Sequence, residues 1–328
     1  MLKRWQKSWR SLCLTTALML LAFAAPAQAQ ETYGYTTPNL PPNYNQGSGY
    51  IDSMYHFILY LTGAVMIAVF VCLAIFLVKY RHRPGRRATY IHGNQKLEVV
   101  WTLIPSAILV LIAAFSQNIW SQMKSPALMP TGDDVVRVRV VARQFNWFFH
   151  YPGPDGKFGE TDIHWRQDSG DAAAQIGLRR GNPEYFMSEA QLQELQNDPD
   201  RSHLLEPDPN AYDDVCTTTE MRVPIGRKVH VEITSKDVLH SFFLPNFRVK
   251  QDAVPGLNGH VWIHPTITSA EAVGRDADGN PKAFDIVCAE LCGSNHYTMQ
   301  GLMFVVSEEE YQQWLEDNAS DPAEFEDY

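Results

Sequence analysis

Charged residues are missing from two long stretches of this 328-residue sequence, residues 57–78 and 99–115. A stretch of about 20 residues without charge is long enough to cross a bilayer as a helix. This length and lack of charge argue against two buried helices of a soluble domain. We therefore predict a transmembrane hairpin over residues 55–122, with crossings at about 55–79 and 97–120. Pro105 lies inside the second crossing, where neighbouring groups can satisfy the carbonyl that a proline leaves free.

Acidic residues are missing from the loop between the two crossings, residues 80–96, which carries Arg81, Arg83, Arg86, Arg87 and Lys96. Basic loops stay on the cytoplasmic side of a membrane. Both flanks then lie outside: a short arm, residues 30–54, and a C-terminal domain, residues 123–328. The chain is thus expected to be a multi-pass protein of a bacterial inner membrane with its C-terminal domain in the periplasm.

The first 29 residues also lack acids, and they combine four basic residues with an apolar run and a small-residue site, Ala27-Gln28-Ala29. This combination predicts a secretory signal peptide that is cut after Ala29. The apolar run, about 12–25, is short of the ~20 residues that a retained anchor needs. The formal net charge is −10 before cleavage, and removal of four positive charges makes the exported protein still more acidic. An acidic surface suits a basic soluble partner.

The outer domain alternates apolar and polar residues over 135–141, the pattern of a half-buried strand. Similar strand-like runs follow at residues 220–223, 228–234, 259–263, 283–288 and 302–306, with Gly- and Pro-containing turns between them. Short strands at this spacing predict an antiparallel sandwich or barrel. Residues 153–215 are polar and predict a long surface insertion with one helix at 188–196, capped by Ser188. An acidic tail after Val306 begins with a predicted short helix.

Cysteine is rare, with five in the whole chain, yet two of the five share one loop, CAELCGSNHYTM. Cys288, Cys292, His296 and Met299 are soft or borderline metal ligands. Three interpretations are open: a plain disulfide, a structural zinc site, and a copper site with one cysteine more than a blue-copper centre needs. A copper site would need a second histidine, which this loop does not supply. His240, in the apolar stretch KDVLHSFFLPNF, is the best candidate among the remaining histidines.

At these residues the chain resembles subunit II of the haem-copper cytochrome c oxidases. The resemblance is carried by LEVVWTLIP, VPIGRKVHVEITSKDVLHSFFLPNF, VKQDAVPGLN and CAELCGSNHYTM. It implies a two-helix transmembrane hairpin followed by an all-β cupredoxin domain, a Greek-key β-sandwich. It also implies a binuclear copper centre, CuA, with ligands His240, Cys288, Glu290 (through its backbone carbonyl), Cys292, His296 and Met299. The Glu290 side chain would help to hold Mg²⁺ shared with subunit I.

The same resemblance implies a role in electron transfer. The subunit would accept electrons from a soluble cytochrome c and pass them to haem in subunit I of an aa3-type oxidase, which reduces O₂ to water and pumps protons. Subunits I and III and the membrane are the implied partners, and no nucleic acid is expected. Glu98, at the cytoplasmic start of the second crossing, matches a family glutamate at the mouth of a proton-uptake channel, although an acid there could also merely end the helix.

The chain departs from the family pattern where electrons arrive. The segment QFNWFFHYP places Phe145 at the position of the family's electron-accepting tryptophan and keeps only Trp147, so both residues are candidates for that role. Lys236-Asp237 precede the VLHS motif, and the 153–215 insertion is longer than usual. Two rival functions are a quinol oxidase subunit, which lacks the copper ligands, and a membrane-anchored copper chaperone, which needs neither Glu98 nor Glu290. No C-x-x-C-H haem motif follows, so the electron donor is expected to be a separate protein.

Overall fold

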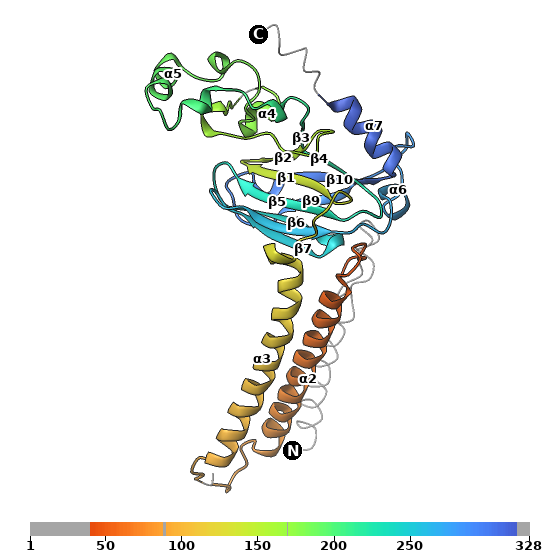
Figure 1. The fold of residues 1–328 in the computed structure, drawn as a ribbon. Coiled ribbons are helices and arrows are strands. Elements are labelled where there is room, and N and C mark those ends of the chain that lie inside the picture. Colours follow the sequence, from red (N-terminus) through yellow and green to blue (C-terminus); the bar gives the residue numbers. More distant parts are fainter. Residues whose placement is uncertain (1–39, 88–89, 169, 320–328) are drawn as a thin grey trace. The chain divides into compact units, whose positions relative to one another are not determined.

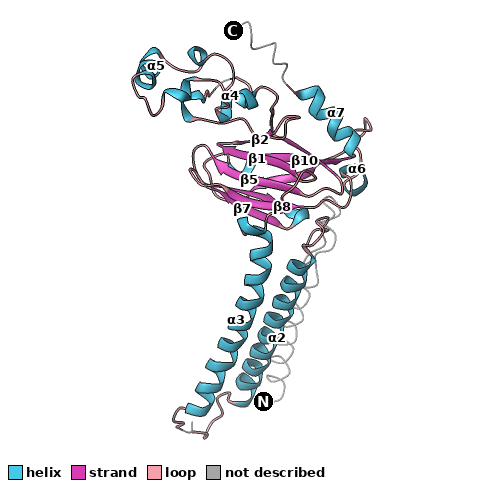
Figure 2. Ribbon diagram, in the orientation of Figure 1, coloured by secondary structure: helices cyan, strands magenta, loops and turns pink. Residues whose placement is uncertain are grey.

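The computed structural model describes residues 40–87, 90–168 and 170–319. The predicted signal peptide, residues 30–39 of the predicted N-terminal arm and the end of the acidic tail lie outside these residues. The helices and strands of the described residues belong to one compact unit, Tyr44–Tyr328. Figure 1 labels most of these elements along the chain, and Figure 2 colours helices and strands differently.

Two long helices, α2 (Gly49–Lys79) and α3 (Gln95–Lys124), are both apolar and long enough to cross a membrane. The start of α3 is capped by Asn94, whose side chain accepts a hydrogen bond from the backbone N–H of Leu97 (3.2 Å), and the helix continues through Pro105. The helix α2 begins before the charge-free stretch. In its first turn, the Ser53 hydroxyl donates to the carbonyl of Gly49 (3.1 Å).

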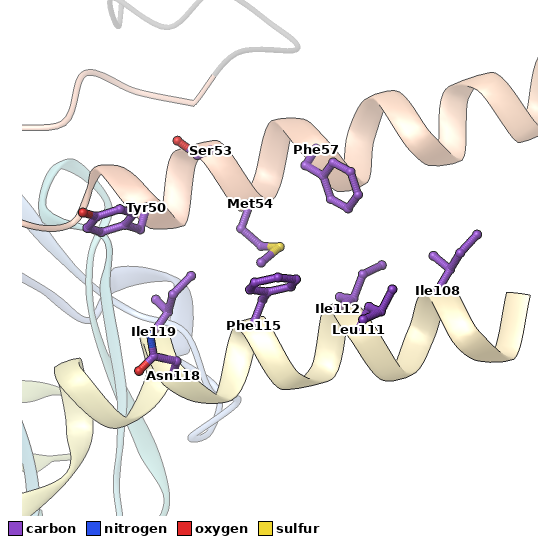
Figure 3. A pocket seen from close by; sticks show the side chains of 10 residues that line it. All are labelled: Tyr50, Ser53, Met54, Phe57, Ile108, Leu111, Ile112, Phe115, Asn118 and Ile119. Carbon is purple, nitrogen blue, oxygen red and sulfur yellow. The ribbon is translucent and has the colours of Figure 1, made fainter.

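An apolar groove of about 600 Å³ lies between α2 and α3. Figure 3 shows Met54 and Phe57 of α2 pointing toward Phe115 and Ile112 of α3. Side chains of this kind are stable in contact with lipid tails or with another apolar helix. The two helices therefore leave part of their facing surface free for such a neighbour.

The periplasmic domain contains two five-stranded sheets, ordered β3-β2-β1-β5-β8 and β4-β10-β9-β6-β7. The strands are β1 (Val136–Arg143), β2 (Asn146–Tyr151), β3 (Val215–Thr218), β4 (Glu220–Pro224), β5 (Val229–Ser235), β6 (His240–Leu244), β7 (Val249–Ala253), β8 (Gly259–Ile263), β9 (Phe284–Cys288) and β10 (Gln300–Val306). The prediction of a purely antiparallel sandwich is wrong in one respect. Strand β1 pairs with β5, and β4 with β10, in parallel, because long connections rather than hairpins join them.

The core between the strands is built by residues that alternate along them. Strand β5 alternates strictly between buried and partly exposed residues, and Val231 and Ile233 are fully buried. Aromatic side chains fill the centre, where Trp147 and Phe242 meet edge to face with ring centroids 5.5 Å apart. The ends of the strands around this core carry the candidate site.

The insertion at 153–215 has a small core of its own, formed by Trp165, Met187 and Leu195. It contains the short helices α4 (Ala172–Ile176) and α5 (Glu189–Gln196), together with the 3-10 turns η2 (Ile163–Trp165), η3 (Pro183–Tyr185), η4 (Ser202–Leu205) and η5 (Pro209–Ala211). The predicted helix at 188–196 is confirmed as α5, and Ser188 forms a capping box at its start.

The remaining short elements are η1 (Pro126–Leu128), η6 (Pro245–Phe247), α6 (Ser269–Ala272), η7 (His296–Thr298) and α7 (Glu308–Asn318). The helix α7 confirms the short helix predicted after Val306. Three glutamates occupy its first turn, where they interact favourably with the helix dipole.

Candidate metal centre

Five of the predicted ligand side chains lie together in the periplasmic domain. The Cys288 Sγ atom lies 3.9 Å from His240 Nδ1 and 3.9 Å from Cys292 Sγ. In turn, Cys292 Sγ lies 3.6 Å from His296 Nδ1 and 3.8 Å from Met299 Sδ. Of these five, His240, Cys288 and Cys292 place their ligand atoms within 4.8 Å of one another, which makes them a group able to hold a metal ion.

The ends of neighbouring strands bring these residues together. His240 is the first residue of β6 and Cys288 the last residue of β9, and the two strands pair through Phe242 and Cys288. Met299 directly precedes β10, and His296 begins η7 in the loop between β9 and β10. Four ligand positions thus sit at one end of a sheet, where the hydrogen-bonded strands fix their spacing.

The loop that carries Cys292 is tied to the turn between β1 and β2. The Gln144 side chain donates a 2.6 Å hydrogen bond to the Cys292 carbonyl. Gly293 has a φ of +139°, and a Cβ atom there would lie 2.9 Å from Gln144 Nε2 and 3.2 Å from the Phe145 ring. The loop therefore requires glycine at this position both for its backbone conformation and for the close approach of Gln144.

A carboxylate fixes the orientation of His240. Asp237 accepts a 2.9 Å hydrogen bond from His240 Nε2 and a 2.8 Å bond from the backbone N–H of Gln144. This bond leaves Nδ1 facing the Cys288 sulfur. Such a carboxylate–histidine pair is a common support of metal-binding histidines. Asp237 is not among the site residues predicted from the sequence, although its spacing three residues before His240 is a usable signal.

The two thiols differ in acidity. Burial raises the pKa of Cys288, but the hydrogen bond with His240 and nearby backbone N–H groups outweigh it and lower the pKa below its usual range. Burial and the neighbouring Cys288 thiolate raise the pKa of Cys292. Metals bind the thiolate form, so an ion that binds both sulfurs must displace the proton held by Cys292.

Comparison with known proteins assigns the chain to a family. Residues 46–119 match the cytochrome C oxidase subunit II transmembrane domain, and residues 205–306 match the periplasmic domain of the same subunit. The alternative cytochrome c oxidase subunit 2 of Bradyrhizobium diazoefficiens is 32% identical, over 82% of this chain and 80% of the relative. The cytochrome c oxidase subunit 2 of Cereibacter sphaeroides is 34% identical, over 93% of this chain and 89% of the relative. This chain belongs to the cytochrome c oxidase subunit II family.

Family membership confirms the predicted fold class and location. The matched domains and the two apolar helices show a membrane protein whose C-terminal domain is periplasmic and cupredoxin-like. A solved periplasmic domain of subunit II from Bradyrhizobium japonicum is 26% identical, covers 58% of this chain and 95% of that chain, and has a TM-score of 0.33.

The two aromatic candidates for electron acceptance lie beside the predicted ligands. Trp147 is fully buried in β2, and its ring lies 6.2 Å from that of His240, centroid to centroid. Its indole Nε1 is buried without a hydrogen-bond partner. Phe145 is partly buried and lies against the loop at Gly293. Trp147 therefore contacts the predicted ligand His240 from inside the core, and Phe145 approaches the loop at Gly293 from the β1–β2 turn.

Of the two predicted glutamates, Glu290 lies at the cysteine cluster and Glu98 does not. Glu290 is exposed, and its backbone carbonyl accepts a 3.2 Å hydrogen bond from the Cys288 thiol, so it joins the cluster through its backbone. Glu98 is exposed in the first turn of α3, and its carbonyl accepts a 2.8 Å bond from Thr102. Glu98 belongs to the transmembrane hairpin and is not among the residues that the structure brings together around the cysteines.

Proposed function

We propose that this subunit holds a binuclear copper centre, CuA, through which electrons pass from a soluble cytochrome c to haem in subunit I of an aa3-type cytochrome c oxidase. The observation that carries the proposal is the pair of cysteine sulfurs 3.9 Å apart, each beside its own imidazole nitrogen. A single-metal zinc site needs no such symmetry.

The donor set fits copper. Thiolate, imidazole and thioether are the ligands that copper prefers among protein side chains. A disulfide would bring the sulfurs to about 2.05 Å, whereas Cys288 and Cys292 are both free thiols here, and it would leave His240, His296 and Met299 without a role. When bound, copper supplies a one-electron carrier at this end of the sheet.

The surrounding residues would keep the ligands in place during electron transfer. Asp237 orients His240, Gln144 holds the loop at Cys292, and the ends of β6 and β9 fix His240 and Cys288. Ligands that are held in one arrangement lose little energy to rearrangement when the charge of the site changes. This rigidity supports a centre that transfers electrons rather than one that stores or releases metal.

Exposed apolar side chains next to the ligands support docking of a protein partner. Leu291 and Tyr297 are 78% and 79% exposed, and they directly adjoin Cys292 and His296 in sequence. Exposed apolar residues grouped at one functional loop are typical of interaction surfaces. The insertion contributes Asp168, which pairs with Lys236 at 3.0 Å and so offsets the base that departs from the family pattern.

Two further parts of the proposal concern the assembled oxidase. The exposed Glu290 carboxylate would supply a hard oxygen ligand to Mg²⁺ shared with subunit I. Glu98 would receive protons at the cytoplasmic surface, in a complex with subunits I and III. We expect Glu98→Gln to slow oxygen consumption by the assembled oxidase while leaving the spectrum of the copper centre unchanged.

The decisive experiment is copper reconstitution of the full-length chain in detergent, followed by optical and electron paramagnetic resonance spectroscopy. One unpaired electron shared by two equivalent coppers, lost in Cys292→Ser, is the expected result. A single-copper spectrum or a colourless zinc-loaded protein would instead favour a storage or structural role for the loop.

A further inference from the structure

A second cluster of metal-ligating side chains, His230, Glu232 and His260, lies on the other sheet, which contributes none of the proposed copper ligands. His230 and Glu232 alternate along β5 with buried residues such as Val231, so they face away from the core. Strand β8 runs antiparallel to β5 and places His260 directly opposite Glu232. The strand register thus brings all three side chains onto one outer face.

The spacing of the two imidazoles matches that of two ligands on one metal ion. His230 Nε2 and His260 Nδ1 lie 3.2 Å apart, and the ligand atoms of all three residues lie within 4.8 Å of one another. Nitrogen ligands at about 2.0–2.1 Å from a four-coordinate metal are about 3.3 Å apart in a tetrahedral arrangement. The two imidazoles therefore lie close enough to share an ion once the rings turn so that both nitrogens face it.

We infer that His230, Glu232 and His260 bind a divalent transition-metal ion of the Zn²⁺ class. Two imidazoles and one carboxylate are a known three-residue ligand set for zinc, with water in the fourth position. The absence of sulfur in the group disfavours Cu⁺, and the two imidazoles disfavour Mg²⁺ and Ca²⁺. All three residues are partly exposed, so an ion can reach them from solvent.

Two arginines on β1 limit how tightly this site binds. Glu232 accepts hydrogen bonds from Arg137 (3.1 Å) and Arg139 (3.3 Å), and these bonds hold its carboxylate beside β5. The same positive charges repel a bound dication. The Arg137 side chain is 41% exposed and that of Arg139 is 23% exposed. Arg137 can therefore move away from Glu232 more readily than Arg139. The site is therefore expected to be weaker than one without these arginines.

A metal here would join an edge strand to its neighbour. Strand β8 is the last strand of its sheet and pairs with β5 on one side only. An ion bound by His260 of β8 and by His230 and Glu232 of β5 would link the two strands through their side chains. An ion that binds the folded protein but not the unfolded chain also raises the melting temperature.

The test uses the untagged full-length chain in detergent, carrying Cys288→Ser and Cys292→Ser so that no thiolate of the first cluster takes part. Zn²⁺ binding is measured by calorimetry, and Co²⁺ is used as an optical probe. We expect one equivalent to bind, and His230→Gln and His260→Gln each to weaken binding by at least about tenfold. His264→Gln is the matched control, because His264 follows β8 directly but bonds to the carbonyl of Gly226.

Arg137→Gln gives a result that damage to the fold cannot mimic, since removing a nearby positive charge should tighten Zn²⁺ binding by about tenfold. Circular dichroism checks that each variant is folded. Unchanged affinity in both histidine variants, or no Zn²⁺ binding at millimolar concentration, would overturn the inference. The two imidazoles would then form only a hydrogen bond to each other.

Discussion

Replacing Asp237 removes the carboxylate that orients His240, and we expect copper binding to weaken while the domain stays folded. Asp237 accepts hydrogen bonds from His240 Nε2 (2.9 Å), from the backbone N–H of Gln144 (2.8 Å) and from its neighbour Val238 (2.7 Å). His240 itself is fully buried. Without Asp237 its ring can rotate or adopt the other tautomer, and Nδ1 no longer has to face Cys288.

The size of the effect follows from the bond that is lost. A hydrogen bond to a charged group contributes about 1.5–3 kcal/mol, and loss of such a partner of a metal ligand typically lowers metal affinity by about 10–100-fold. These two ranges agree, because tenfold in affinity corresponds to about 1.4 kcal/mol. Asp237→Asn keeps an acceptor oxygen and should fall at the lower end. Asp237→Ala loses all the bonds and should fall at the upper end.

The assay is a competition for copper between the full-length protein in detergent and a chelator of known affinity, read from the absorption of the loaded centre. Asp285→Asn is the control, since Asp285 is an exposed carboxylate on β9, the strand that carries Cys288. Circular dichroism reports whether each variant is folded. A folded Asp237→Ala protein whose copper affinity stays within about twofold of wild type would refute the proposed role of the carboxylate.

Three other predictions concern the insertion and the ligand loop. Asp214→Asn should destabilise the domain by about 2–4 kcal/mol, because the buried Asp214 carboxylate accepts hydrogen bonds from His150 and from two backbone N–H groups. Thermal unfolding measures this loss, and Asp213→Asn is the control. Burial, opposed by Asp214, lowers the pKa of His150 from 6.5. The contribution of His150 to the stability of the folded domain is therefore complete above pH 6.5 and is lost as the pH falls below that value. Melting temperatures recorded against pH should show this loss, and the loss should be smaller in His150→Gln. Gly293→Ala should lower copper loading, measured by metal analysis, because its Cβ would lie 2.9 Å from Gln144 Nε2; normal loading would contradict the close packing of this loop.

Local patterns in the sequence predicted much of the fold. The two charge-free stretches correspond to α2 and α3, and the alternation over 135–141 corresponds to β1. Strands β2 and β6 escaped prediction because they are nearly continuous runs of buried residues, NWFFHY and HSFFL, without alternation. Periodicity alone cannot separate such runs from buried helix segments. The parallel pairing of β1 with β5 was also missed, since it joins segments about 90 residues apart.

The two metal-ligating clusters show where sequence reasoning reaches its limit. Cys288, Cys292 and His296 are close together along the chain, so their residue types alone indicated a metal site. His230 and His260 are separated by 30 residues, and each looks like an ordinary strand residue, since His230 has a buried neighbour on either side and His260 has one in Val261. They become a pair only because β5 and β8 align in one particular register, and a shift of one residue would turn either histidine toward the opposite face. Ligand sets that depend on register therefore have to be sought in the structure, whereas those within one loop can be found in the sequence.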